Sequence, residues 1–423
     1  MEVKEIIPKK KINAVIAIPG SKSYANRALI IAALAKGTTT LTNVPSCDDV
    51  KYMLSAIKLL GVEVEEISST EIKITPQEKL QYRGEINVGG AGTAMRFLTS
   101  LISLGVGDIL LSGNERMCER PIEDLVQALE TNIEGTIVSE NKTKKGERCP
   151  PLKINSKGLK GGIIKIKGNT SSQYLSSILL SAPYAKEKVQ VEIIDELTSK
   201  SYADMTLDIM KTFGINVQNN DYKNFVVPKK EYICRDYFVE IDSTGAGYFL
   251  AATAIIGGKI KIKNVNLNSV QGDFGFIDIL EKMGCKIEKE KGYLYLESNG
   301  ELNGVEVDMN TLPDSAQTLA IVASVAKGKT KITGISNLKV KETNRIEAMK
   351  IELEKCGINV EAGDDYMIIE GGKPIGAQIA TYNDHRMAMS FAVMGAKIPG
   401  IKIENPSCVS KSFPEFWELL NNI

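Results

Sequence analysis

Basic and small polar side chains recur where apolar segments of this chain begin. Lys22 and Arg27 lie at the start of SKSYANRALIIAALA, and Gly92 opens GTAMRFLTSLISLG. The other small or polar residues at or near such starts are Ser23, Gly90, Thr93, Arg96, Thr170, Ser171, Ser172, Gln173, Asp314, Asn383, His385 and Arg386, with Arg120, Lys341, Arg345 and Lys411 in loops or first turns nearby in sequence. The first N–H groups of a helix lack helical partners and carry partial positive charge, so converging helix starts bind anions. The pattern predicts a site for phosphate and carboxylate groups.

Each of these residues taken alone has a simpler interpretation. Ser, Thr, Asn and Asp at a helix start are usually N-caps, and a single Lys or Arg is usually a solvated surface charge. The combination favours a site, because the segments are apolar nearly all round and should lie in the interior. An unpaired charge is costly there.

The glycine-rich stretch VGGAGTAMRF does not match the common nucleotide-binding motifs. It has no GK[ST] after its glycines, and it lacks the third glycine and the acidic partner of a dinucleotide fingerprint. A short glycine turn that lets the backbone approach a small anion at a helix start fits better.

Amphipathic segments of a second kind alternate with the apolar ones. Five of them combine a helical pattern, a glycine and a short strand, and they begin at Asp49, Ile122, Asp204, Phe274 and Ile346. The glycines at which these helices should end are Gly61, Gly135, Gly214, Gly284 and Gly357, at intervals of 74, 79, 70 and 73 residues. The tail from Pro414 predicts a sixth helix, without a following strand. Six α/β units of this length predict a compact pseudo-symmetric fold, divided three plus three near Val239.

Composition excludes several classes of protein. Lys plus Arg and Asp plus Glu both number 52, so bulk charge gives no reason to expect nucleic acid or an anionic membrane as partner. No apolar run approaches the length of a membrane span. The seven cysteines are never spaced C-x-x-C and His385 is the single histidine, so we expect a reduced, cytoplasmic protein without a metal site.

Nine stretches, in order from Pro19 to Trp417, resemble the 5-enolpyruvylshikimate-3-phosphate synthase family. They are PGSKSYANRALIIAAL, GGAGTAMRFL, RMCERPI, TSSQY, SKSYADMTL, MNTLPDSAQTLA, KVKETNRI, YNDHRMAMSFA and SKSFPEFW. The resemblance implies an α/β (α+β) protein of two similar domains, each with three βαβαββ repeats around interior helices. The N-terminal domain would be 21–239, mainly binding shikimate 3-phosphate. The C-terminal domain would be 1–20 plus 240–423, with phosphoenolpyruvate contacts and the catalytic acids.

The resemblance also implies which residues bind each substrate. Shikimate 3-phosphate would be bound by Lys22, Ser23, Arg27, Ser171, Ser172, Gln173, Ser199, Tyr202, Asp314, Asn337 and Lys341. Phosphoenolpyruvate would be bound by Lys22, Gly92, Arg120, Gln173, Arg345, Arg386 and Lys411. The family implies no cofactor and no metal, and a monomer that is the target of glyphosate.

The implied chemistry is addition followed by elimination. The 5-hydroxyl of shikimate 3-phosphate attacks C2 of phosphoenolpyruvate while C3 takes a proton, and the intermediate then expels phosphate. Asp314 is the candidate base, Lys22 and Glu342 are candidates for moving the proton at carbon, and His385 is a further candidate.

Three positions depart from the family pattern. Gly90 stands where Asn is common, Phe97 where Pro is common and Asn344 where Asp is common. The missing amide at Gly90 puts one polar contact near phosphoenolpyruvate in doubt. Phe97 is expected to shift the helix that positions Gly92 and Arg96, and so to change the affinity for phosphoenolpyruvate.

Two other functions remain open from the sequence. The sister enzyme that transfers enolpyruvyl to UDP-N-acetylglucosamine shares the fold and carries a reactive cysteine in the loop where Cys118 lies. The stretches KETNR, NDHRMAM and TSSQ favour shikimate 3-phosphate. A non-catalytic anion-binding homologue is the second alternative, but it has no reason to keep Asp314 and Glu342 beside clustered cations.

Overall fold

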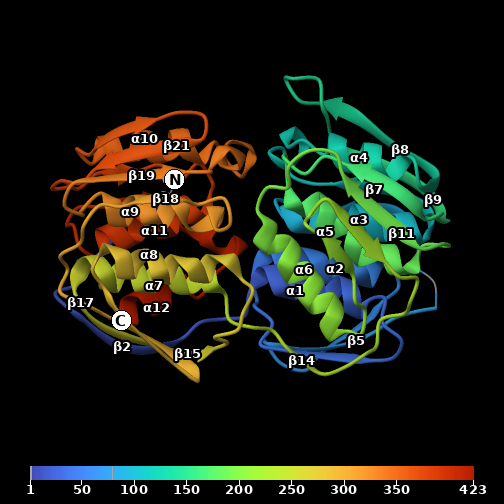
Figure 1. Ribbon diagram of the computed structural model, residues 1–423, viewed down its shortest axis with the longest axis horizontal. Coiled ribbons are helices and arrows are strands. Elements are labelled where there is room, and N and C mark those ends of the chain that lie inside the picture. The colour runs from blue at the N-terminus through green and yellow to red at the C-terminus, as the bar shows by residue number, and fades with distance from the viewer. Residues whose placement is uncertain (1, 79) are drawn as a thin grey trace. The chain divides into compact units, whose positions relative to one another are not determined.

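A computed structural model describes residues 2–78 and 80–423, and the chain folds into two compact units. One is Gly20–Val239, called here the N-terminal unit. The other, called the C-terminal unit, combines Met1–Pro19 with Glu240–Ile423. Figure 1 labels the helices and strands of both. In the described part of the chain, no helix has both the length and the apolar character that a membrane span requires.

The N-terminal unit contains three four-stranded sheets of the same design. Their orders are β14-β3-β5-β4, β6-β7-β9-β8 and β10-β11-β13-β12. In each, the first two strands run parallel and the remaining pairs antiparallel. The strands are β3 Thr39–Thr42, β4 Glu63–Glu66, β5 Glu71–Thr75, β6 Gln81–Asn87, β7 Val106–Ser112, β8 Ile133–Lys142, β9 Arg148–Leu159, β10 Gly162–Ile166, β11 Val189–Ile193, β12 Gln218–Asn220, β13 Asn224–Val227 and β14 Tyr237–Phe238.

Six helices accompany these sheets, and alternate ones are buried all round. The interior helices are α1 Lys22–Ala32, α3 Gly92–Leu104 and α5 Ser172–Ser181. The outer helices are α2 Asp48–Leu59, α4 Glu123–Glu130 and α6 Lys200–Thr212, with short 3-10 turns η1 Met117–Glu119 and η2 Ala182–Tyr184. The interior helices are buried on every side, as α3 illustrates with burial of Gly92 through Ser103.

The C-terminal unit repeats the design with one variation. Two sheets have four strands, in the orders β16-β17-β15-β2 and β18-β19-β21-β20, and the third has the order β1-β23-β22. The strands are β1 Val3–Glu5, β2 Ile12–Ala17, β15 Gly258–Val265, β16 Lys286–Glu290, β17 Gly292–Ser298, β18 Glu306–Asp308, β19 Lys329–Thr333, β20 Asn359–Ala362, β21 Tyr366–Glu370, β22 Gln378–Ile379 and β23 Lys402–Glu404. Strand β1, from the N-terminal end of the chain, pairs antiparallel with β23 and takes the place of the third strand.

Interior and outer helices alternate here as well. The interior ones are α7 Ser243–Ile256, α9 Ala316–Ala323 and α11 His385–Gly395, and the outer ones are α8 Phe276–Met283, α10 Arg345–Lys355 and α12 Phe416–Asn422. Within the described residues of this unit, a 3-10 turn comes shortly before each of α8, α9, α10 and α12. These turns are η3 Gly272–Gly275, η4 Pro313–Ser315, η5 Ser336–Val340 and η6 Pro406–Lys411. The predicted six α/β units with interior helices are confirmed.

One predicted helix end is wrong. Four of the five marker glycines follow a helix with positive φ, as Gly61 (φ 92) and Gly284 (φ 118) do. Helix α4 instead ends at Glu130, and Gly135 lies inside β8 next to a bulge, with φ 154. A glycine in a strand commonly marks such a bulge. Gly135 therefore has the predicted positive φ, but it lies in a strand and does not end a helix.

Candidate active site

In the N-terminal unit, one buried guanidinium joins three helices. Arg27, one turn into α1, donates from Nε to Thr206 Oγ1 at 2.8 Å and from Nη2 to Ser176 Oγ at 3.3 Å. It also donates to the carbonyls of Ser23 and Tyr202 at 2.9 and 3.0 Å. Arg27 therefore joins α1 to the middle of α5 and to α6. Burial lowers the pKa of Arg27 to about 10, which leaves it charged at neutral pH.

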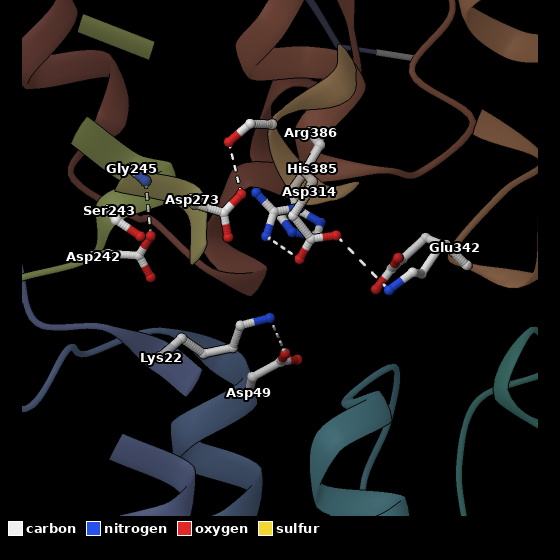
Figure 2. Close-up of polar contacts among 12 residues, drawn as sticks. Lys22, Asp49, Asp242, Ser243, Gly245, Asp273, Asp314, Glu342, His385 and Arg386 are labelled. Atoms are coloured by element: carbon white, nitrogen blue, oxygen red, sulfur yellow. Dashed lines mark hydrogen bonds and ion pairs between the residues drawn. The ribbon is translucent and has the colours of Figure 1, made fainter. Parts of the chain in front are cut away.

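Lys22 is the first residue of α1, and it is paired. Its Nζ lies 3.2 Å from Oδ2 of Asp49, a carboxylate at the start of α2 that is 2% exposed (Figure 2). Ser21 caps the same helix through its hydroxyl, which accepts from the backbone N–H of Tyr24. The Lys22 ammonium is therefore held at a helix start by a carboxylate that the sequence analysis did not single out.

Gly92 begins α3, with a guanidinium directly over it. A Cβ on Gly92 would lie 2.7 Å from Nη1 of Arg120. Arg96 lies beneath, donating to the carbonyls of Gly92 at 3.3 Å and Pro121 at 3.1 Å. Arg96 thus holds the turn that carries Arg120, and the absent side chain at Gly92 gives the Arg120 guanidinium its place. The arrangement suits an anion that approaches the start of α3.

The third helix start carries hydroxyl and amide groups. The Ser171 hydroxyl caps α5 and accepts from the backbone N–H of Gln173, while Ser172 opens the helix. Ser199, with left-handed backbone at φ 52, precedes α6, and Tyr202 lies in the first turn of that helix. The Tyr202 carbonyl accepts from Arg27, so the predicted polar residues of α1 and α6 lie together.

The C-terminal unit gathers carboxylates and cations around Arg345, whose side chain is 2% exposed. Its Nε donates to Asp384 Oδ2 at 2.8 Å, Nη1 to Asp314 Oδ1 at 3.0 Å and Nη2 to Glu342 Oε2 at 2.8 Å. Burial alone would lower the pKa of Arg345, but the charges of these three carboxylates outweigh it and raise the pKa above its usual range. Arg345 is therefore a permanent cation that fixes three acids.

Three further cations border the same acids. Arg386 Nη2 lies 2.8 Å from Asp314 Oδ2, and Lys341 Nζ lies 3.8 Å from Asp314 Oδ1. Lys411 Nζ lies 3.6 Å from Oε1 of Glu342. Figure 2 shows Asp314 beside Arg386, with a dashed line for their contact. Four cations and three carboxylates thus meet in one small region of the C-terminal unit. There Asp314 and Glu342 can exchange protons with a substrate, and the cations can bind its anionic groups.

His385 and Asn337 lie beside this cluster rather than at its centre. His385, the first residue of α11, is 1% exposed, and its Nδ1 lies 3.5 Å from Asp384 Oδ1. Asn337 is buried in η5, the turn that leads to Lys341.

Three acids of the site were missed by the sequence analysis. Asp384 caps α11 and accepts from the Arg386 N–H at 2.9 Å, Asp49 pairs with Lys22, and Asp273 lies buried beside the residue that follows Asp314. For Asp384, the place directly before the basic His385–Arg386 start was an available signal, because Asp is a preferred N-cap. Asp49 and Asp273 lack such a local signal, since their partners are distant in sequence.

The three positions that depart from the family pattern each have a defined contact in the structure. A Cβ on Gly90 would lie 3.2 Å from Nδ2 of Asn114. The Phe97 ring lies under the Arg27 guanidinium, 5.3 Å from centroid to Cζ. Asn344 caps α10 by accepting from the Glu347 N–H at 3.5 Å, a role that Asn and Asp fill about equally well. Cys118, half-buried in η1, has its thiol 3.6 Å from the Gly113 carbonyl.

Comparisons with known proteins agree across the whole chain. The family model described as EPSP synthase (3-phosphoshikimate 1-carboxyvinyltransferase) matches residues 6–420. A 3-phosphoshikimate 1-carboxyvinyltransferase from Aliivibrio fischeri is 44% identical over 434 residues, which cover 100% of each chain. The protein of the same name from Vibrio vulnificus is 43% identical over 430 residues, covering 100% of this chain and 99% of the relative.

A solved structure shares the fold. The EPSP synthase of Acinetobacter baumannii, determined at 2.37 Å, superimposes with a TM-score of 0.82 at 28% sequence identity. The match covers 99% of this chain and 97% of that one.

Proposed function

The chain belongs to the EPSP synthase family, and from this membership we propose the part that each site residue plays in the reaction. The chain is an enzyme that transfers the enolpyruvyl group of phosphoenolpyruvate to the 5-hydroxyl of shikimate 3-phosphate, releasing phosphate, in the shikimate pathway to aromatic amino acids. Enzymes of this class are the target of glyphosate.

Shikimate 3-phosphate is bound mainly through the N-terminal unit. Its ligands there are Lys22, Ser23, Arg27, Ser171, Ser172, Gln173, Ser199 and Tyr202, joined by Asp314, Asn337 and Lys341 of the C-terminal unit. The contacts of Arg27 with α5 and α6 support this assignment, because a cation and hydroxyl groups at one place suit a phosphorylated polyol.

Phosphoenolpyruvate is bound by cations of both units. Lys22, Gly92, Arg120 and Gln173 contribute from one, and Arg345, Arg386 and Lys411 from the other. The Arg120 guanidinium over the start of α3 supports the first set, and the burial of Arg345 and Arg386 supports the second. Planar guanidinium groups pair with carboxylate and phosphate through two bonds at once.

Asp314 is the base for the addition step. It takes the proton of the 5-hydroxyl as that oxygen forms a bond to C2, while C3 receives a proton from Lys22 or Glu342. In the elimination step C3 returns a proton, the double bond re-forms and the C2–O bond to phosphate breaks. The observation that carries this assignment is the Asp314 carboxylate held by Arg345 on one oxygen and Arg386 on the other. That contact fixes the direction of the acid.

His385 acts through Asp384 rather than on substrate. Its ring is 1% exposed and lies beside the carboxylate that orients Arg345. We assign it a positioning role, which needs no change of protonation.

The protein is expected to act in the cytoplasm as a monomer, without a cofactor. The seven cysteines are thiols rather than disulfides, as is typical of a reducing compartment. Size-exclusion chromatography with light scattering tests the oligomeric state.

A direct assay of two acceptors tests the function. The purified chain is incubated with phosphoenolpyruvate and either shikimate 3-phosphate or UDP-N-acetylglucosamine, and phosphate and the enolpyruvyl product are both measured. Turnover with shikimate 3-phosphate alone is expected. Turnover with the nucleotide sugar alone, the reaction of the cysteine-carrying sister enzyme, would reject the assignment.

A further inference from the structure

The carboxyl group of Asp273 lies next to the turn that presents Asp314. Asp273 belongs to η3, is 5% exposed and accepts a hydrogen bond from the Ser315 hydroxyl, with 2.7 Å between Ser315 Oγ and Asp273 Oδ1. Ser315 is 1% exposed, follows Asp314 in the chain and occupies the N-cap position of α9. The contact therefore joins η3 to the residue next to Asp314 in the chain.

The two turns are held by neighbouring contacts as well. Gln271, just before η3, donates from Nε2 to the Ile241 carbonyl at 2.9 Å and accepts from the Ser243 N–H at the start of α7. A Cβ on Gly275 would be 3.8 Å from the side chain of Leu312, which precedes η4. Asp273 is thus fixed in the fold and can in turn fix the backbone at Ser315.

The charges around Asp273 are those of the proposed site. Burial is the largest influence and raises its pKa to about 6, and the negative charge of Asp314 acts in the same direction. The Ser315 hydrogen bond and the positive charge of Arg386 oppose this rise, and Asp242, the N-cap of α7, adds to it. Figure 2 shows the Asp273 carboxyl group close to Asp314 and Arg386.

We propose that Asp273 is a positioning residue for Asp314, which it orients through Ser315 and whose basicity it sets through its own negative charge. The inference rests on the proposed role of Asp314 as base. When Asp273 is ionised, a second negative charge near Asp314 makes loss of the 5-hydroxyl proton to Asp314 more favourable. When Asp273 is protonated, that assistance is lost and the addition step slows.

The test separates the charge of Asp273 from its hydrogen bond. D273N keeps an oxygen that can accept from Ser315 but removes the charge, whereas S315A keeps the charge and removes the bond. kcat is measured at saturating shikimate 3-phosphate and phosphoenolpyruvate from about pH 5 to about pH 9. Wild type should show an inflection near the pKa of Asp273, about 6. D273N should lose that inflection with kcat lowered ~10-fold at neutral pH, and S315A should keep it with a lower kcat throughout.

The outcomes that overturn the inference are distinct from those that overturn the proposed base. A D273N enzyme with the wild-type pH profile rejects the role of Asp273, even if its kcat is lower, because a purely structural role would not move the profile. If D273N does not fold, S315A decides the matter. An unchanged kcat in S315A rejects the inference, and so does the absence of the inflection from its pH profile. D314N is measured in parallel. An active D314N rejects Asp314 as base, whereas an inactive D314N with a wild-type-like D273N rejects the role of Asp273 alone.

Discussion

Nη1 of Arg345 lies 3.0 Å from Oδ1 of Asp314, and both side chains belong to the C-terminal unit. The same guanidinium also binds Glu342 and Asp384, so one buried cation sets the positions of three acids. In the proposed reaction, Arg345 therefore has two tasks, because it binds the carboxylate or phosphate of the donor and also orients the base. Its loss should affect kcat and the KM for phosphoenolpyruvate together.

Lys22→Ala should abolish turnover without unfolding the protein. The change removes a cation from the start of α1 and leaves Asp49, 2% exposed, without its 3.2 Å partner. We expect kcat to fall by about 10²-fold or more, as for loss of a group that transfers a proton or stabilises charge in the transition state. Lys36→Ala is the matched control, since Lys36 is exposed and pairs loosely with Glu231 at 3.6 Å. Circular dichroism of both variants verifies the fold. Near-normal kcat in Lys22→Ala would remove Lys22 from the mechanism.

Gly92→Ala should weaken binding of the donor. The new methyl group would lie 2.7 Å from Nη1 of Arg120, so the guanidinium must move. The KM for phosphoenolpyruvate should rise about tenfold or more, with a parallel loss of inhibition by glyphosate, a phosphonate mimic of it. Gly372→Ala, whose methyl group would be in ordinary contact at 3.5 Å from Ile358, is the control. An unchanged donor KM together with unchanged inhibition would place Gly92 away from the site.

Gly90 and Asn114 should behave as a coupled pair. The family commonly has Asn at position 90, but here a Cβ at that position would lie 3.2 Å from Asn114 Nδ2. Gly90→Asn alone should therefore lower the melting temperature, and Asn114→Ala should relieve the crowding in the double variant. Asn114→Ala has its own cost of about 1 kcal/mol, because Asn114 Oδ1 accepts from the Met117 N–H at 2.9 Å. A double-mutant cycle on melting temperatures measures the coupling, and strictly additive effects would contradict it.

Asp273→Asn should stabilise the protein more at neutral pH than in acid. Because the pKa of Asp273 in the folded state, about 6, is above the ordinary 3.8, its favourable contribution is complete below about pH 3.8 and is lost as the pH rises through 6. The shift corresponds to roughly 3 kcal/mol at most. Melting temperatures of variant and wild type are compared at about pH 4.5 and about pH 7.5. Asp278→Asn, at an exposed ion pair with Lys289, is the control. A difference between variant and wild type that does not change with pH would contradict the prediction.

Local sequence patterns were sufficient to predict the interior helices and the polar residues at their starts. Helix α3 is mostly apolar and begins at Gly92, so its burial and its glycine start could both be predicted from the sequence. The cations that meet near Asp314 were predicted for the same reason, because each lies at or close to a helix start.

Features that depend on distant partners were not predictable in this way. Strand β1 has three residues, and its pairing of Val3 with Glu404 has no local signature. Asp49 and Asp273 became site residues only when the fold brought them to Lys22 and Ser315. Gly135 misled the prediction because positive φ is required both after helices and at bulges.

The kcat of Asp314→Asn tests the account most directly. The amide keeps the size of the carboxylate and one of the two acceptor oxygens that bind Arg345 at 3.0 Å and Arg386 at 2.8 Å, but it cannot take a proton from the 5-hydroxyl. At saturating substrates we predict a fall of about 10³-fold or more in kcat, with binding of shikimate 3-phosphate, measured by calorimetry, changed by less than about tenfold. A kcat within about tenfold of wild type would show that Asp314 is not the base.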